Sequence, residues 1–247
     1  MIRTAWSVLG LSFAIVSTIL TMPATAADPA SPDTVQPVPR DDKWMKVQDA
    51  INARAKQGDV DLIFIGDSIT AGWQGKNGKD VWANYYGSRK AMNAGIGGDR
   101  TQHVLWRLDN GNVDGISPKL AVVMIGTNNA RANESKDTAA GIKAIVDKLR
   151  AKAPQTKILL LAIFPRGETP TDPARLKNIA VNETIKGYAD GEQVRYLDIG
   201  PKFLDDKGTL SREIMPDLLH LSQKGYEIWA TSIEPEVASV LGPKSGG

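Results

Sequence analysis

Cysteine is absent from this 247-residue chain, and only two histidines, His103 and His220, are present. Without cysteine there is no disulfide bond, thiol nucleophile or thiolate metal ligand, so a hydrophobic core must stabilise the fold. Two histidines are too few for a metal site with three imidazole ligands. Scattered carboxylates form no convincing metal-binding pair, and we expect neither a metal nor a cofactor.

An excess of charge of one sign is also lacking. The chain has 30 lysines and arginines against 28 aspartates and glutamates, and its net charge is +2. No concentrated basic cluster breaks this balance, so the sequence predicts no nucleic-acid partner. Hydrophobic residues make up 42% of the chain, which is ordinary for a globular protein with a sizeable core.

The first 26 residues differ from the rest. Arg3 is their only charged residue, an apolar run extends from Ala5 to Leu20, and the small residues Ala-Thr-Ala end at Ala26. This order is typical of a secretory signal peptide, and the run is short for a membrane span. We expect residues 1–26 to be removed, which leaves a periplasmic or secreted protein of net charge +1 without stable membrane insertion.

One domain is predicted between residues 41 and 241. It is preceded by a proline-rich segment, residues 27–40, which has the composition of an extended linker, and it is followed by a flexible tail over residues 242–247. No internal repeat interrupts it.

Apolar runs alternate with helical patterns along this domain, and the runs suit strands that are buried on both faces of a parallel sheet. The strand candidates are Val60–Gly66, Ala91–Gly95, Lys119–Gly126, Lys157–Phe164 and Gln193–Ile199. Apolar stripes at helical spacing occupy residues 41–57, 142–149 and 226–233, with a weaker helical pattern over residues 173–188. The alternation predicts a three-layer α/β/α sandwich with about five strands.

Ligands of such sheets bind beyond the carboxyl ends of the strands, where three polar segments occur: GDSIT, NAGIGGD and GTNN. Ser68 in the first segment follows a buried strand and is expected to open a helix. There it could act as a nucleophile, or it could simply cap the helix. The Gly98 N–H and the Asn128 amide could stabilise an oxyanion, although both residue types are also common in turns.

Asp217 and His220 provide the remaining groups for acyl transfer. On a helical turn, positions i and i+3 face the same side, so the carboxylate could fix the imidazole that accepts a serine proton. The alternative is a helix-capping aspartate beside an unrelated histidine. The competing base, His103, lies in the apolar sequence HVLWRL, and we interpret it as a structural or pocket-wall residue.

Together, the four segments GDSIT, NAGIGGD, GTNN and DLLH resemble the SGNH, or GDSL-type, hydrolase family. The longer stretches IGGDRTQHVLWRLDNG, PRGE and DLLHLSQKGY look like the platelet-activating-factor acetylhydrolase catalytic subunits. The similarity extends over about residues 60–230. No G-x-S-x-G motif surrounds Ser68, so the chain does not resemble an ordinary α/β-hydrolase.

This resemblance implies a flavodoxin-like SGNH fold and a metal-free serine esterase for short acyl groups. It assigns Ser68 as nucleophile, His220 with Asp217 as the base pair, and Gly98 and Asn128 with the Ser68 N–H as the oxyanion hole. It also suggests a monomer or homodimer. Those acetylhydrolase subunits are cytosolic, whereas this chain has an export signal, so small acyl esters or acetylated glycans are expected as substrates.

Three alternatives share the same residues: an exported thioesterase or lysophospholipase, an acyltransferase, and a non-catalytic glycan-binding module. The segment from Trp73 to Trp82 could shape the pocket for the alcohol half of the substrate, or its tryptophans could pack in the core.

Overall fold

A computed structural model of the chain describes residue 1 and residues 31–244. The predicted signal peptide, residues 1–26, lies outside the described residues except for Met1. The last three residues of the predicted tail, 245–247, lie outside them as well.

Five parallel strands form one sheet in the order β2-β1-β3-β4-β5, and each corresponds to a predicted strand. They are β1 (Leu62–Gly66), β2 (Ala91–Gly95), β3 (Leu120–Met124), β4 (Lys157–Leu161) and β5 (Val194–Leu197). The register pairs Gly66 with Gly95 on one side and with Met124 on the other. The carboxyl ends of the three strands that precede the polar segments are therefore level at one edge of the sheet.

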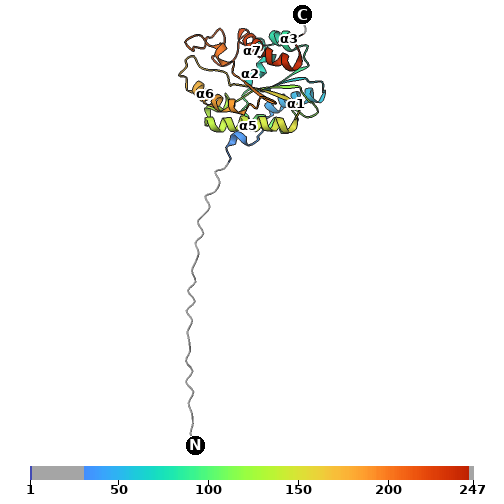
Figure 1. Cartoon of the computed structure of the whole chain (residues 1–247), viewed down its shortest axis with the longest axis vertical. Helices are drawn as coiled ribbons and strands as arrows, with labels where there is room; N and C mark the ends of the chain where they lie inside the picture. Colours follow the sequence, from blue (N-terminus) through green and yellow to red (C-terminus); the bar gives the residue numbers. More distant parts are fainter. Residues whose placement is uncertain (2–30, 245–247) are drawn as a thin grey trace. The chain divides into compact units, whose positions relative to one another are not determined.

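Helices cover both faces of the sheet, which gives the predicted three-layer α/β/α architecture (Figure 1). They are α1 (Asp42–Lys56), α2 (Ser68–Ala71), α3 (Lys79–Tyr86), α4 (Thr101–Asp109), α5 (Ser135–Lys152), α6 (Pro173–Ile185) and α7 (Gln223–Leu241). Short 3₁₀ helices include η1 (Asp33–Val35), η2 (Gly72–Gln74) and η3 (Asn129–Arg131). No helix within the described residues is both long and apolar enough to cross a bilayer.

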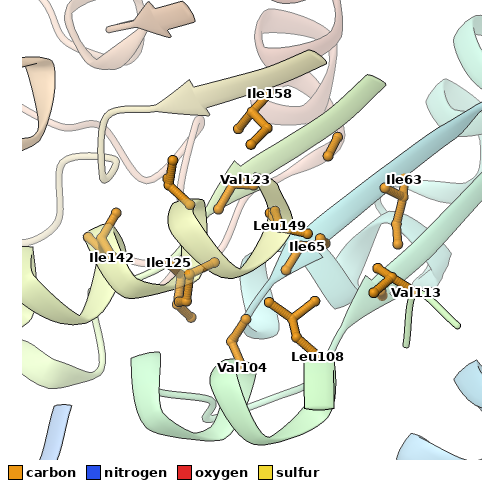
Figure 2. Close-up of a cluster of buried hydrophobic side chains, with 14 of the residues drawn as sticks. Ile63, Ile65, Val104, Leu108, Val113, Val123, Ile125, Ile142, Leu149 and Ile158 are labelled. Atoms are coloured by element: carbon orange, nitrogen blue, oxygen red, sulfur yellow. The ribbon is translucent and has the colours of Figure 1, made fainter. Parts of the chain in front are cut away.

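Alternate residues of the strands supply the two cores. Ile65 points toward α4 and α5, where it lies near Leu108 and Leu149 (Figure 2). Ile63, on the same side of the sheet, lies near Val113. This face is covered by α1, α4, α5 and α6. The intervening positions point to the opposite face, beneath α3 and α7. Because every residue of β1 and β3 is buried, the continuous apolar runs predicted these strands correctly.

Aromatic side chains dominate the second core. Phe64 lies among Trp73, Tyr86 and Trp229, with ring centroids 4.9–6.1 Å from its own. Trp73 is fully buried there, and the Trp82 ring lies 5.2 Å from Phe64. The tryptophans of the segment 73–82 therefore pack on the sheet, as the second interpretation of this segment expected.

Residues 31–40, predicted as part of the linker, pack against the domain instead. Thr34 is fully buried: its hydroxyl donates to the carbonyl of Asp137 at 2.6 Å, and its own carbonyl accepts from Thr101 Oγ1 at 2.9 Å. The proline content predicted an extended backbone, but it gave no sign that this backbone binds α4 and α5. The domain therefore begins before residue 41.

The close contact between β2 and α2 can be tested by substitution of Gly95. A Cβ atom at this position would lie 2.3 Å from the Ala71 nitrogen and 2.7 Å from the Thr70 carbonyl carbon. These are backbone atoms that cannot rotate away, so Gly95→Ala should lower the free energy of unfolding by about 1–3 kcal/mol in urea titrations. At Gly187 a Cβ would meet nothing within 4 Å, and Gly187→Ala serves as the control. Equal stability of the two variants would contradict the packing.

Candidate active site

Ser68 stands at the carboxyl end of the first strand. The chain leaves β1 through Gly66, and the Asp67 carboxylate caps α2 by accepting the Ile69 N–H at 3.0 Å. Ser68 is thus the first residue of a helix, as expected, and its side chain stays partly exposed. The hydroxyl of Tyr226, from α7, donates to the Ile69 carbonyl at 2.7 Å, which ties the first turn of α2 to α7.

His220 and Asp217 meet this serine from the other end of the chain. The Ser68 Oγ lies 2.8 Å from His220 Nε2, although 152 residues separate them in sequence. His220 Nδ1 lies 2.6 Å from Asp217 Oδ2. The structure therefore brings the three predicted residues together in one chain of hydrogen bonds, from hydroxyl to imidazole to carboxylate.

The local conformation of this segment is not the helical turn that we expected. Residues 217–220 form an irregular turn in which Leu218 has a φ of 61°. Asp217 Oδ1 accepts the N–H groups of Leu219 at 3.1 Å and His220 at 2.7 Å, a local turn that aspartate side chains favour. The carboxylate thus fixes both the backbone and the ring of the histidine. Burial alone would raise the pKa of Asp217, but the hydrogen bonds from His220 and these amides outweigh it and lower the pKa.

Gly98 and Asn128 lie on loops that meet at the same edge. Gly98 is exposed and has a φ of +78°, which favours glycine. Its neighbour Gly97 lies so near Ser68 that a Cβ there would be 4.0 Å from the serine Cβ. Asn128 Nδ2 donates to the Asp99 carbonyl at 2.9 Å, which leaves the second amide hydrogen for another acceptor. The two predicted donors therefore belong to adjoining loops beside the serine.

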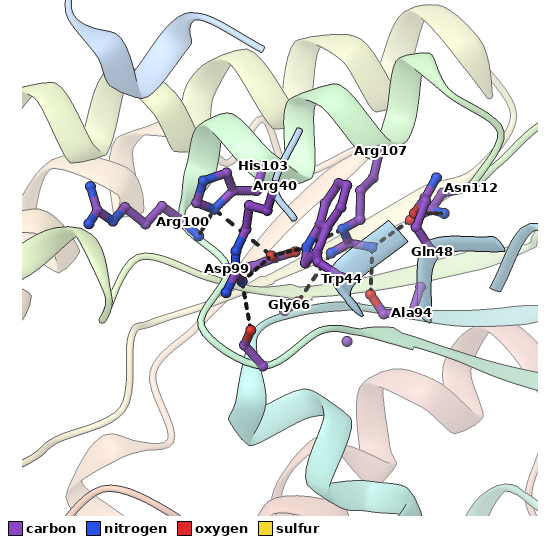
Figure 3. Close-up of polar contacts among 12 residues, drawn as sticks. Arg40, Trp44, Gln48, Gly66, Ala94, Asp99, Arg100, His103, Arg107 and Asn112 are labelled. Carbon is purple, nitrogen blue, oxygen red and sulfur yellow. Dashed lines mark hydrogen bonds and ion pairs between the residues drawn. The ribbon is translucent and has the colours of Figure 1, made fainter. Parts of the chain in front are cut away.

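A buried ion pair between Asp99 and Arg107 lies next to the loop of Gly97 and Gly98 (Figure 3). The Arg107 side chain is fully buried, and its Nε donates to Asp99 Oδ2 at 2.8 Å. The remaining guanidinium nitrogens donate to the carbonyls of Ala94 at 2.8 Å and Gly66 at 3.2 Å, and to Asn112 Oδ1 at 2.5 Å. Burial raises the pKa of Asp99 and lowers that of Arg107, while their mutual attraction opposes both shifts.

Arg40 completes the support from the N-terminal segment. Its Nη1 donates to the Gly97 carbonyl at 2.7 Å and lies 3.3 Å from Asp99 Oδ1, which also accepts the Trp44 indole N–H at 2.7 Å (Figure 3). The roles of Arg40, Asp99 and Arg107 were not predicted from the sequence. A charged Arg107 within the apolar run HVLWRL was a usable signal, because a buried arginine needs a partner. Nothing in the proline-rich segment singled out Arg40.

His103 has a separate role on α4. Its Nδ1 accepts the Arg100 N–H at 3.0 Å at the start of the helix, and its ring packs edge-on to Trp44. Burial, with the charges of Arg40 and Arg100, lowers the pKa of His103 to about 4. A neutral, partly buried histidine that caps its own helix matches the structural role we expected.

A scan of family models matches residues 64–228 of the chain to the GDSL-like lipase/acylhydrolase family. Among curated proteins, the chain is 40% identical over 201 residues to bovine platelet-activating factor acetylhydrolase IB subunit alpha1. The match covers 81% of this chain and 84% of that protein.

Solved structures share the fold at lower identity. A putative acylhydrolase from Bacteroides fragilis superposes with a TM-score of 0.67 at 22% identity, covering 81% of this chain and all of that one. A catalytic mutant of an acetylxylan esterase from Geobacillus stearothermophilus superposes with a TM-score of 0.58 at 18% identity, covering 75% of this chain and 96% of that one.

The buried carboxyl group of Asp67 should make the stability of the protein depend on pH. Its Oδ2 has no hydrogen-bond partner among residues 31–244, and burial raises its pKa from 3.8 to about 7. The folded protein therefore holds this proton more tightly than the unfolded chain, so the stability contributed by Asp67 is complete below pH 4 and is lost as the pH rises through 7. Asp67→Asn cannot ionise, and it should lose less stability than the wild type between pH 5 and pH 8 in urea titrations.

A matched control for this comparison is Asp206→Asn, because Asp206 is exposed. This variant should retain the wild-type pH dependence. Parallel stability curves for Asp67→Asn and the wild type would show that Asp67 does not carry the effect.

Proposed function

The chain belongs to the GDSL-like lipase/acylhydrolase family, and from this premise we propose that it is a serine esterase for short acyl esters, above all acetyl esters on small molecules or carbohydrates. Family membership makes it a carboxylic-ester hydrolase. The observation that carries the assignment of its nucleophile is the 2.8 Å contact between Ser68 Oγ and His220 Nε2.

In the proposed reaction, Ser68 attacks the ester carbonyl while His220 Nε2 accepts the hydroxyl proton. Asp217, bonded to Nδ1, holds the ring in the tautomer that leaves Nε2 free and stabilises the imidazolium that forms. His220 then delivers the proton to the leaving alcohol. Water attacks the acyl-serine, with the same imidazole as its base, and releases the acid.

The developing oxyanion would be held by the N–H groups of Gly98 and Ser68 and by the side-chain amide of Asn128. Arg40 and the pair of Asp99 with Arg107 act on these donors only through the loop that they hold. Donors that are already oriented before the reaction stabilise charge without reorganisation at the moment of attack. We therefore assign Arg40, Asp99 and Arg107 a positioning role in catalysis.

Two further observations support the substrate class. The bovine relative is an acetylhydrolase by name, and a protein of the same fold is an acetylxylan esterase. Acetylated polysaccharides occur outside the cytoplasm, which suits the export predicted from residues 1–26. We include export, to the periplasm or the medium, in the proposal.

The wild type should hydrolyse p-nitrophenyl acetate faster than the butyrate and octanoate esters, and Ser68→Ala should lose this activity by about 10³-fold or more. Alanine fits the first turn of a helix, so the variant should fold. The measurements are initial rates with the three esters, and labelling by a fluorophosphonate probe.

Ser239→Ala is the control, because Ser239 is exposed on α7. It should keep both activity and labelling. Hydrolysis that persists in Ser68→Ala would refute the nucleophile, and rates that rise from acetate to octanoate would favour a thioesterase or lysophospholipase instead.

Removing the amide of Asn128 tests the oxyanion site. Asn128→Ala should lower kcat by about 10²–10³-fold with little change in KM, because the lost hydrogen bond forms mainly in the transition state. The variant also loses the bond to the Asp99 carbonyl, so thermal unfolding should be recorded alongside. Unchanged turnover, or a rise in KM alone, would remove Asn128 from the oxyanion site.

A further inference from the structure

The turn that carries the proposed base, His220, lies outside every helix and strand. It spans residues 216–222, and the side chains of His220 and Asp217 are 45% and 57% exposed. Leu218 has a φ of 61°, a conformation that is unfavourable for residues other than glycine. Asp217 fixes the imidazole within the turn, but the position of the turn relative to Ser68 must come from contacts with other segments.

Two hydrogen bonds from other segments hold the backbone of this turn. On the side before His220, the Leu218 carbonyl accepts the N–H of Gly167, from the loop after β4, at 3.0 Å. On the side after His220, the Leu221 carbonyl accepts the side-chain amide of Asn77 at 3.1 Å, across 144 residues of sequence. The base therefore lies between two bonds that come from distant parts of the chain.

Asn77 provides the second of these bonds through its side chain. Among residues 31–244, no other side chain from outside the turn hydrogen bonds the backbone of residues 217–221. The side chain of Leu221 is buried in the second core, and its carbonyl belongs to the residue directly after His220. A displacement of this carbonyl would therefore move the imidazole as well.

The loop that presents Asn77 is itself closely packed. The N–H of Gly75 donates to the Gly72 carbonyl at 2.9 Å, and the N–H of Gly78 donates to the Gly75 carbonyl at 3.1 Å. A Cβ atom at the buried Gly78 would lie 2.5 Å from the Gly72 oxygen and 2.6 Å from Trp73 Cα. Only glycine allows the loop to lie this near to η2, so η2 determines where the Asn77 amide stands.

This loop belongs to the same stretch of chain as the proposed nucleophile. Ser68 begins α2, η2 follows α2 without a gap, and Asn77 comes shortly after η2. The bond from the Tyr226 hydroxyl to the Ile69 carbonyl also joins this stretch to the C-terminal part of the chain. That bond connects two helices, whereas the bond from Asn77 reaches the irregular turn. The segment that presents the serine thus also holds the turn of the histidine.

We propose that Asn77 is a positioning residue, which holds the Leu221 carbonyl and thereby keeps His220 Nε2 within reach of Ser68 Oγ. Proton transfer requires a hydrogen-bond distance between these atoms. A turn released from Asn77 would bring the imidazole into this range for a smaller fraction of the time. The inference rests on the proposed esterase function and adds a residue that acts through the base rather than on the substrate.

Asn77→Leu and Asn77→Asp test this role at pH 8, because leucine and ionised aspartate are close to asparagine in size but cannot donate to a carbonyl. Each should lower kcat for p-nitrophenyl acetate about tenfold, with KM within about twofold of the wild-type value. Asn84→Leu is the matched control, since Asn84 is exposed on α3, and it should keep the wild-type kcat. Initial rates give both constants, and thermal melting followed by circular dichroism checks that the variants fold.

A second comparison separates an effect through His220 from a general loosening of the site. In a His220→Ala background the base is gone, so the addition of Asn77→Leu should change the residual rate by less than about twofold. A tenfold fall in this background too would show that Asn77 supports the serine or the oxyanion donors, and it would overturn the assignment. If the residual rate does not exceed spontaneous hydrolysis, kcat and KM of the single variants decide.

Unchanged kcat in both Asn77 variants, or a rise in KM alone, would overturn the positioning role, while Ser68-dependent hydrolysis would leave the proposed function intact. Wild-type kcat in Asn77→Asp with a loss in Asn77→Leu would also overturn it, because the donor would then be dispensable. A wild type that hydrolyses no ester would overturn the proposed function and the positioning role with it. Should Asn77→Leu fail to fold, Asn77→Asp decides the test.

Discussion

Under the carboxyl ends of β1 and β2 lies a guanidinium group without access to water, that of Arg107. It binds the carbonyls of Gly66 and Ala94 and the carboxylate of Asp99 at once. Gly66 stands two residues before Ser68, and Asp99 follows Gly98 directly. One side chain therefore joins the strand that presents the serine to the loop that borders it.

A buried ion pair of this kind adds little net stability, because the desolvation of both charges offsets most of their attraction. Its value here is geometric. Removal of Asp99 would leave the buried charge of Arg107 without this carboxylate, and removal of Arg107 would leave Asp99 with the longer, 3.3 Å contact to Arg40. Alternative arrangements of the loop are therefore disfavoured. The donors of Arg107 also bind backbone carbonyls at the ends of both strands, and the Gly66 carbonyl accepts the Ile96 N–H at 3.2 Å as well. The positions of Ser68 and of the Gly98 loop are thus fixed by buried contacts of Arg107 rather than by contacts between exposed loops.

Much of the fold could be predicted from the sequence because local patterns and tertiary packing agree. A strand buried on both faces has to be apolar throughout, as β1 and β3 are. Three strands were predicted from such runs, and β2 and β5 from the shorter candidates Ala91–Gly95 and Gln193–Ile199. The alignment of Ser68, Asp217 and His220 was predicted from residue types and order, yet the expected helical turn was wrong. The short backbone hydrogen bonds of Asp217 produce the same contact through a different conformation. The aspartate side chain here accepts backbone N–H groups in place of helical hydrogen bonds, and residue spacing alone does not predict which of the two will form.

The contacts that could not be predicted are long-range and polar. Arg40 and Asp99 are 59 residues apart, and neither carries a periodic signal that would bring them together. Polar contacts of this type depend on the tertiary arrangement of the loops rather than on the local conformational preferences of the sequence.

The docking of residues 31–40 on α4 and α5 has a practical consequence for the protein. Arg40 reaches the loop of Gly97 from a segment that is anchored at Thr34, so the length of the N-terminus is coupled to the geometry around Ser68. Proteolytic trimming past Thr34 would remove the anchor, and the enzyme would be impaired by a cut made far from its serine.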